Sequence, residues 1–307
     1  MPTQLLSLLR YLPRRARQER HDHQVQGELN WRGGAPSGVP RGLSLQWLGT
    51  SGFRLRSGGY SLLIDPYATR VPLGVALGRA PVSPDRERVD RHLPRADAVL
   101  IGHTHFDHAM DAPMIARRDG CTVYGSRSLV NLMAAEGLTA QAVEVEPYRV
   151  YELGPFRVSF VPSAHSKLML GLSVPSSGDI TCEHVDGLAC GAYRCGQVYG
   201  IHVEVDGVSL YHQGSADLLE DAIRHRDVDF FLVGIAGRGF TRDYTRRILR
   251  ALRPRCVIPH HHDDFFRGLD APMRFSFNVN LGGFVDEVAA VSREFSIVTL
   301  DPMQEVE

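Results

Sequence analysis

The chain has 307 residues, of which 43% are hydrophobic and 22% charged, values typical of a globular protein with a sizeable core. Its 34 basic and 35 acidic residues give a net charge of −1, so the basic excess of most nucleic-acid-binding proteins is missing and we expect no nucleic-acid partner. Five cysteines at irregular spacing predict no disulfide framework, which favours a cytoplasmic location.

The first 42 residues are predicted to form an arm and a linker ahead of one domain at 43–307. A helix near the start would carry its leucines on one face, with arginines beside them: Leu5, Leu8, Leu9 and Leu12. This helix either docks on the domain or on a second subunit of a homo-oligomer, or it binds an anionic membrane surface weakly. No segment approaches the ~18 apolar residues of a membrane span. Residues 27–42 are rich in Gly and Pro, which is typical of a linker.

The domain is predicted to begin with short strands. "LSLQWL", "GFRLRS" and "YSLLIDP" are separated by glycines, which suggests an antiparallel meander. After a loop over 70–95, "DAVLIG" is a buried-looking strand. Helices are expected at 112–118 and 126–136, and strands near 121–124, 142–146 and 156–161.

The second half of the domain has a similar pattern of strands followed by helices. "VYGIHVEVDGVSLYHQG" predicts two strands joined by the hairpin turn Asp206-Gly207. A helix at 217–226, the strand "VDFFLVG", a helix near 240–252, the strand "CVIP" and a helix near 284–293 follow. Because strands precede helices twice, we expect an α/β protein with two sheets and helices outside them.

A cluster of metal-ligand residues follows the "DAVLIG" strand, in "IGHTHFDHAMDAP". His103 and His105 alternate on an extended segment, so their side chains point to the same side. His108 arrives as the chain turns into a helix, whose start would aim Asp107 into the same pocket. This set of nitrogen and oxygen donors suits Zn²⁺, or another metal such as iron or manganese.

The cluster resembles the metal motif of the metallo-β-lactamase superfamily. "WLGTSGFRLRSGGYSLLIDPY" resembles the opening strands of that fold, with Asp65 at its buried structural aspartate. "VPSAHSK" places His165 at the third ligand, and "VIPHHHDDFF" places His261 at the strand-end ligand. The resemblance covers residues 43–300 and is strongest to the branch of ascorbate-6-phosphate lactonase-like enzymes and the N-acyl-phosphatidylethanolamine phospholipase D. It implies a four-layer αββα sandwich of two mixed β-sheets flanked by helices.

The resemblance also implies two divalent metal ions, with Zn²⁺ expected and Mn²⁺ or Fe as alternatives. The implied catalytic residues are Asp107 and His108. The implied metal ligands are His103, His105, Asp107, His108, His165, Asp217 and His261.

Asp217 enters this set through a departure from the family pattern. The family has Gly-Asp after a strand, and this Asp bridges the metals, but here "LYHQGSADLL" places Ser215 after Gly214. Either the loop carries Asp217 inward, or the bridge is missing and one metal site is weaker. His212, in the strand before, is another candidate for the bridge.

Further polar residues are expected around the ligands. Asp111 would orient a ligating histidine, and Asp263 and Asp264 would do the same for His261. His260 and His262 would point away from His261 if the strand geometry persists, unless one turns towards substrate as a general acid.

Two other motifs have alternative interpretations. The turn "GIAGRGF", with Arg238, is either an anion site or a tight strand-to-helix connection. Three cysteines and one histidine either form a small structural zinc site or include only free thiols: Cys182, His184, Cys190 and Cys195.

The expected function is that of a metal-dependent hydrolase. Metal ions lower the pKa of bound water from ~15.7 towards ~7, which supplies hydroxide for attack on a carbonyl or phosphoryl group. The substrate would be a small ester, lactone or phosphodiester, with pocket walls from the loops 66–95 and 166–197. The alternatives are a lipid phosphodiesterase at a membrane surface, and a metal-binding protein of the same fold without turnover.

Overall fold

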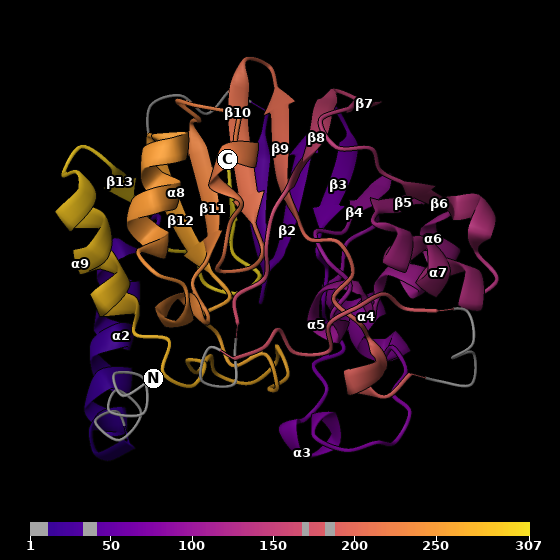
Figure 1. The fold of residues 1–307 in the computed structure, drawn as a ribbon, viewed down its shortest axis with the longest axis horizontal. Helices are drawn as coiled ribbons and strands as arrows, with labels where there is room; N and C mark the ends of the chain where they lie inside the picture. The colour runs from indigo at the N-terminus through magenta and orange to yellow at the C-terminus, as the bar shows by residue number, and fades with distance from the viewer. Residues whose placement is uncertain (1–11, 33–41, 168–171, 182–187) are drawn as a thin grey trace.

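The computed structural model describes residues 12–32, 42–167, 172–181 and 188–307, and its strands form two seven-stranded sheets (Figure 1). The first sheet has the order β14-β1-β2-β3-β4-β5-β6. Its strands are β14 (Glu305–Val306), β1 (Ser44–Gly49), β2 (Gly52–Ser57), β3 (Tyr60–Ile64), β4 (Ala98–Leu100), β5 (Thr122–Gly125) and β6 (Ala142–Glu144). Pairing is antiparallel from β14 to β3 and parallel from β3 to β6, so the sheet is mixed.

The second sheet has the order β13-β12-β11-β10-β9-β8-β7. Its strands are β13 (Ser296–Ile297), β12 (Cys256–His260), β11 (Phe230–Gly234), β10 (Val208–Gln213), β9 (Tyr199–Val205), β8 (Phe156–Pro162) and β7 (Val150–Leu153). Pairing is antiparallel from β7 to β10 and parallel from β10 to β13. The turn between β9 and β10 has positive φ at Asp206 and Gly207, as the predicted hairpin requires.

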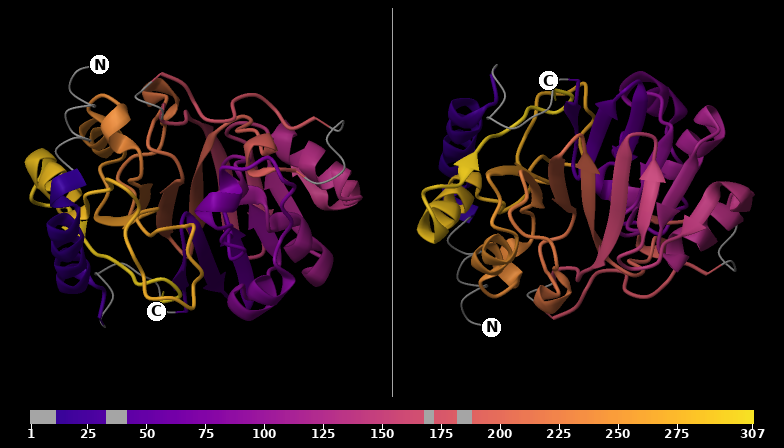
Figure 2. Two further views of the ribbon diagram at one scale, coloured as in Figure 1. Left: turned by 90° about the horizontal axis from the view of Figure 1, so that it is seen from below. Right: turned by 90° about the horizontal axis from the view of Figure 1, so that it is seen from above.

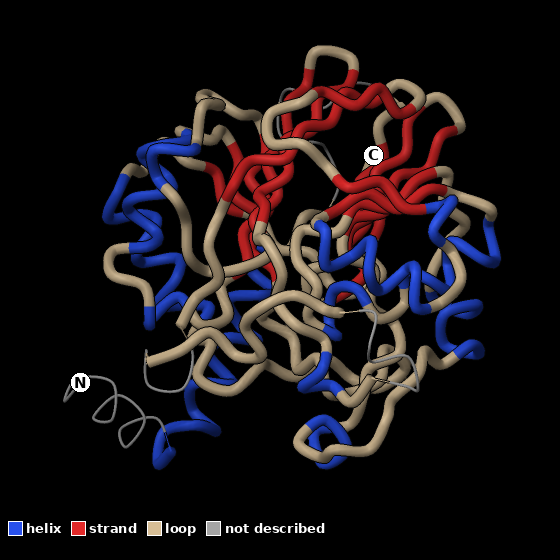
Figure 3. Tube along the Cα trace, turned by 45° about the vertical axis from the view of Figure 1, so that its right-hand side comes forward, coloured by secondary structure: helices blue, strands red, loops and turns tan. Residues whose placement is uncertain are grey.

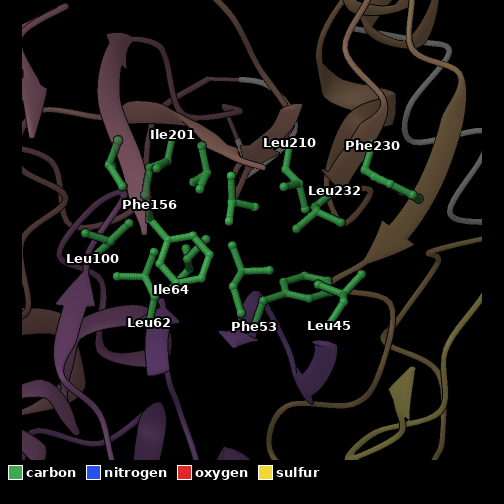
Figure 4. Close-up of a cluster of buried hydrophobic side chains, with 14 of the residues drawn as sticks. Leu45, Phe53, Leu62, Ile64, Leu100, Phe156, Ile201, Leu210, Phe230 and Leu232 are labelled. Carbon is green, nitrogen blue, oxygen red and sulfur yellow. The ribbon is translucent and has the colours of Figure 1, made fainter. Parts of the chain in front are cut away.

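The inner faces of the two sheets share one apolar core (Figure 4). Phe53 and Leu55 of β2 belong to this core, and the arginines between and after them are half-buried on the other face. The alternation follows from the two-residue period of a strand. Leu210 and Leu232 contribute from the second sheet.

Helices cover both outer faces, which makes four layers (Figure 2). The helices of the first half are α3 (Leu73–Ala76), α4 (Arg86–His92), α5 (Phe106–Ala109), α6 (Ala112–Asp119) and α7 (Arg127–Ala135). Those of the second half are α8 (Tyr244–Leu252) and α9 (Leu281–Val291). Short 3₁₀ turns are η1 (Leu12–Arg14), η2 (Thr139–Gln141), η3 (Cys190–Ala192), η4 (Glu220–Ala222) and η5 (Arg238–Phe240). The four-layer αββα sandwich is therefore confirmed.

The described part of the N-terminal arm docks on the domain. Helix α2 (Arg15–Leu29) lies beside α9, and Asp22 Oδ1 accepts the N–H of Gly282 at 3.0 Å. Because α2 extends through Leu29, the linker begins later than residue 27. Leu5, Leu8 and Leu9 lie outside the described residues. Within the described ranges, none of the helices is long and apolar enough to span a membrane.

The predicted helix at 217–226 is wrong, because only the single turn η4 forms there. The amide of Gln213 donates to the carbonyls of Ser215 (2.9 Å) and Asp217 (3.0 Å), and the Asp217 carboxylate accepts the N–H of Leu218. Side-chain hydrogen bonds thus occupy backbone groups that a helix start would use.

Candidate metal centre

Many loops meet at one end of the strands (Figure 3). The candidate metal ligands lie in α5 and in the segments after β4, β8 and β12. His103 follows β4, His105 precedes α5, and α5 carries Asp107 and His108. All four side chains are buried.

The first group consists of His103, His105 and His165, whose nearest ligand atoms all lie within 4.8 Å of one another. His165 comes from the segment after β8. Nε2 of His105 lies 2.9 Å from the carbonyl of Pro175, and Nδ1 of His165 lies 2.8 Å from that of Ser166. A carbonyl only accepts, so each of these nitrogens donates, and the other nitrogen of each ring is left for a metal.

The second group consists of Asp107, His108 and His261. Asp107 Oδ2 lies 3.2 Å from His261 Nε2 and 3.7 Å from His108 Nε2. His108 donates from Nδ1 to Asp65 Oδ2 at 2.8 Å, which leaves Nε2 for a metal. The rings of His103 and His108 are 3.8 Å apart, so the two groups adjoin each other.

Asp65 orients His108. It is fully buried, and its second oxygen accepts the N–H of Gly102 at 2.7 Å. Asp65 also forms a close group with His103 and His108. Because both of its oxygens already accept hydrogen bonds, we assign it to holding His108.

The charge states suit a cation. Burial lowers the pKa of His103 well below its ordinary value, and burial lowers that of His165 to about 3, so both are neutral donors at neutral pH. Burial acts to raise the pKa of Asp107, but His108 and His261 outweigh it and the carboxyl is ionised. Burial acts to lower the pKa of His108, and Asp107 and Asp65 raise it on balance.

One ring nitrogen tests whether a metal fits. Nε2 of His103 is buried and has no hydrogen-bond partner among the described residues. Buried polar atoms are nearly always paired, so an unpartnered nitrogen in a cluster of donors indicates a missing ligand. The residues present therefore fit a metal.

The structure does not bring Asp217 into either group. Its half-buried carboxylate accepts the N–H of Leu218 at 2.8 Å, whereas Ser215 lines the pocket beside the ligands. The loop passes close behind the centre: a Cβ at Gly214 would lie 2.9 Å from Asp65 Oδ2 and 3.3 Å from His108 Cε1.

His212 also stays out of both groups. Its Nε2 lies 2.9 Å from the carbonyl of Ser51, and its ring stacks on that of His260 at 4.9 Å. His262 packs against Trp47, with ring centroids 4.8 Å apart. Both His260 and His262 therefore point away from His261, as predicted.

The expected role of Asp111 is wrong. Its carboxylate accepts the N–H groups of Ala68 (2.6 Å) and Thr69 (3.0 Å), and the hydroxyl of Thr69, so it anchors the loop after β3. Asp111 is the residue immediately before α6, and its side chain makes no capping hydrogen bond to that helix.

The expected contacts of Asp263 and Asp264 with His261 are wrong as well. Asp263 accepts the N–H of Thr50 at 2.9 Å and pairs with Arg70 at 2.7 Å, and Asp264 accepts the N–H of Phe266. The carbonyl of Thr50 in turn accepts the N–H of His261 at 2.8 Å. Asp263 thus supports His261 through Thr50. Nothing in the local pattern around Arg70 or Thr50 indicated this.

Of the two remaining motifs, the structure assigns a structural role to the turn with Arg238. The Arg238 side chain pairs with Glu287 and donates to the carbonyls of Val279 and Asn280, so it is not available for an anion. Cys190 and Cys195 are buried free thiols. Cys182 and His184 lie outside the described residues, so a zinc site there stays a prediction.

A pocket of about 370 Å³ opens over the two ligand groups. Both loops that were predicted as walls contribute to it, at Ala76 and Leu77 and at Pro175, Ser176, Cys190 and Gly191. The lining is completed by the ligands themselves and by Phe106, Ser166, Gly214, Ser215, Ala236, Gly237 and Phe265.

Comparisons with known proteins show the family of this chain. The model of the β-lactamase superfamily domain matches residues 44–261. A UPF0173 metal-dependent hydrolase of Carboxydothermus hydrogenoformans is 29% identical over 229 residues, which are 72% of this chain and 85% of the relative. One of Cereibacter sphaeroides (strain ATCC 17029) is 30% identical over 229 residues, 73% of this chain and 87% of the relative. The metallo hydrolase Igni18 of Ignicoccus hospitalis has the same fold, with a TM-score of 0.57 at 20% identity over 86% of this chain and 97% of Igni18.

Fold, ligand groups and relatives together define a metal-dependent hydrolase. The chain belongs to the metallo-β-lactamase superfamily, as its histidine motif indicated.

Proposed function

We propose that this chain hydrolyses a small ester, lactone or phosphodiester with two divalent metal ions, of which Zn²⁺ is our first choice. His103, His105 and His165 would hold one ion, and Asp107, His108 and His261 the other. The observation that carries the proposal is the pair of adjoining ligand groups at the base of one pocket. Each group supplies three nitrogen or oxygen donors. Such donors suit zinc, and also iron or manganese.

When bound, the ions supply Lewis acidity that activates water and polarises the substrate oxygen. The protein's own groups position the reaction. Asp107 is ionised at neutral pH because of His108 and His261, so its carboxylate can orient the attacking water by accepting a hydrogen bond. His108 is held by Asp65, so its Nε2 keeps a constant direction.

Metal content tests the proposal directly. Elemental analysis of purified wild type should find close to two metal ions per chain. His103→Ala and Asp107→Asn should each lose about one ion, because each removes a donor from a different group. Asp217→Asn is the matched control and should keep both ions, since Asp217 bonds to Leu218 instead.

Turnover is tested with p-nitrophenyl acetate and bis(p-nitrophenyl) phosphate. Hydrolysis of either should stop with a chelator and return with metal. A protein with two ions and no hydrolysis of any ester would support metal binding without turnover instead. One ion in wild type would mean that the Ser215 departure has cost the second site, and no metal at all would reject the proposal.

A further inference from the structure

One wall of the pocket is apolar and reaches from the metal ligands to the protein surface. Phe265 packs edge-on against His261, with ring centroids 5.3 Å apart, and Phe106 lies 6.3 Å from Phe265. Ala76 and Leu77 line the same pocket. We call Ala76, Leu77, Phe106 and Phe265 the apolar wall.

The outer end of the apolar wall is an exposed helix. Helix α3 has no buried residue, and it lies at the edge of the molecule, away from both sheets (Figure 1). Leu73 is 49% exposed, Val75 43% and Leu77 80%. These three residues, the apolar rim, contribute little to the core, whereas exposed apolar side chains beside a pocket are typical of a binding surface.

Apart from the proposed metals, the described lining residues of the pocket offer no cation to an anionic group. Among its described lining residues there is no Lys or Arg, and its one carboxylate is that of Asp107. Arg238, the nearest basic residue in the adjoining turn, is occupied by Glu287. A charged substrate group that lies away from the proposed metals would therefore be desolvated without a cationic partner among these lining residues, which is unfavourable.

Building on the proposed function, we propose that the substrate is an uncharged ester or lactone whose hydrocarbon chain lies along the apolar wall and reaches the apolar rim. Water adds to the carbonyl carbon and the carbon–oxygen bond to the leaving group breaks. The proton from water passes to the leaving oxygen, and the products are a carboxylic acid and an alcohol. The wall is continuous with the ligand groups through Phe265 and His261, so a chain on it would place the carbonyl at the metals.

A series of p-nitrophenyl esters with the metal-loaded full chain tests this proposal. The value of kcat/KM should rise from acetate through butyrate to octanoate, by about fourfold for each methylene that becomes buried. Leu77→Ser and Val75→Ser should each lower the ratio of kcat/KM for octanoate to that for acetate by about threefold or more, because each removes apolar surface from the proposed binding site of the chain. Both side chains are largely exposed, so the variants should fold.

Val150→Ser is the matched control. Val150 is 45% exposed, nearly the same as Val75, and lies on β7 at the opposite end of the molecule from α3 (Figure 1). It should leave the chain-length ratio unchanged. A ratio that falls equally in Val150→Ser and Val75→Ser would overturn the proposal.

Other outcomes separate this inference from the proposed function. Equal rates for acetate and octanoate, or a preference for bis(p-nitrophenyl) phosphate, would overturn the inference while the hydrolase remains. Loss of binding to vesicles of phosphatidylcholine and phosphatidylglycerol in Val75→Ser, with an unchanged chain-length ratio, would make the apolar rim a membrane contact and would also overturn it.

If no probe is hydrolysed, the proposed function fails and binding decides the inference. Octanohydroxamate should then bind the metal-loaded wild type more tightly than acetohydroxamate, and Leu77→Ser should reduce that difference. Equal affinity of both hydroxamates for wild type would overturn the inference.

Discussion

At the scale of single residues, the centre depends on acceptors that hold the outer nitrogens of its imidazoles. Two are backbone carbonyls, at Pro175 and Ser166, and one is the carboxylate of Asp65. A substitution can remove the carboxylate of Asp65 but not a backbone carbonyl, so Asp65 offers the clearest test of these acceptors.

We expect Asp65→Ala to weaken metal binding by about 10- to 100-fold, because His108 loses the acceptor that fixes its ring. The measurement is a competition titration of each protein with a chromogenic chelator. Asp111→Asn is the comparison, since Asp111 is equally buried but bonds to Ala68 and Thr69. Equal metal affinity in Asp65→Ala and wild type would contradict the assigned role of Asp65.

At the scale of elements, strand β9 carries a buried histidine far along the sheet from the ligands. The His202 ring stacks on that of His225, with centroids 3.7 Å apart and planes 13° from parallel. Burial, and then the neighbouring His225, lower the pKa of His202 to about 3. An unfolded chain would protonate this residue near pH 6.5, whereas the folded chain would not.

The free energy of unfolding should therefore fall as the pH drops from about 6.5 towards 3, because the unfolded state binds the extra proton. His202→Phe should remove this contribution, so that wild type loses about 2 kcal/mol more than the variant between pH 7 and pH 5. Urea titrations at both pH values measure it. Any release of metal at low pH affects both proteins alike. An identical fall in the free energy of unfolding in wild type and His202→Phe would therefore refute the expectation.

At the scale of the whole molecule, a buried ion pair joins the two halves of the sandwich next to the centre. Arg70 follows β3 of the first sheet and Asp263 follows β12 of the second, with 2.7 Å between them. Arg70 is only 1% exposed, and Asp263 also accepts the N–H of Thr50. The pair fixes the ends of both sheets that carry metal ligands.

Arg70→Ala should lower the free energy of unfolding by about 3–5 kcal/mol, because it leaves the Asp263 carboxylate buried without its charge partner. Arg149→Ala, which removes the exposed pair with Glu146, should cost about 1 kcal/mol or less. Denaturant unfolding of both variants compares them. Similar losses of unfolding free energy in the two variants would show that burial does not increase the contribution of the Arg70–Asp263 pair to stability.

The sequence by itself determined the fold class and most of the centre. His103, His105, Asp107 and His108 lie within six positions, so a strand end followed by a helix start brings them together without help from the rest of the chain. The alternation in β2 and the hairpin turn at Asp206-Gly207 are equally local. His165 and His261 were placed by resemblance to a known family, and the two groups that they complete agree with that placement.

Only the tertiary structure decided which partner each remaining polar group takes. Asp111, Asp217 and Asp263 were all expected to bind a metal or to orient a ligand, yet they bond to Thr69, Leu218 and Arg70. A buried carboxylate takes whichever N–H or cation the folded chain brings within reach, and a carbonyl such as that of Pro175 has no residue-specific pattern in the sequence. The four candidate ligands at 103–108 were therefore visible in local spacing, whereas the contacts that support the centre depended on segments up to about two hundred residues apart in the chain.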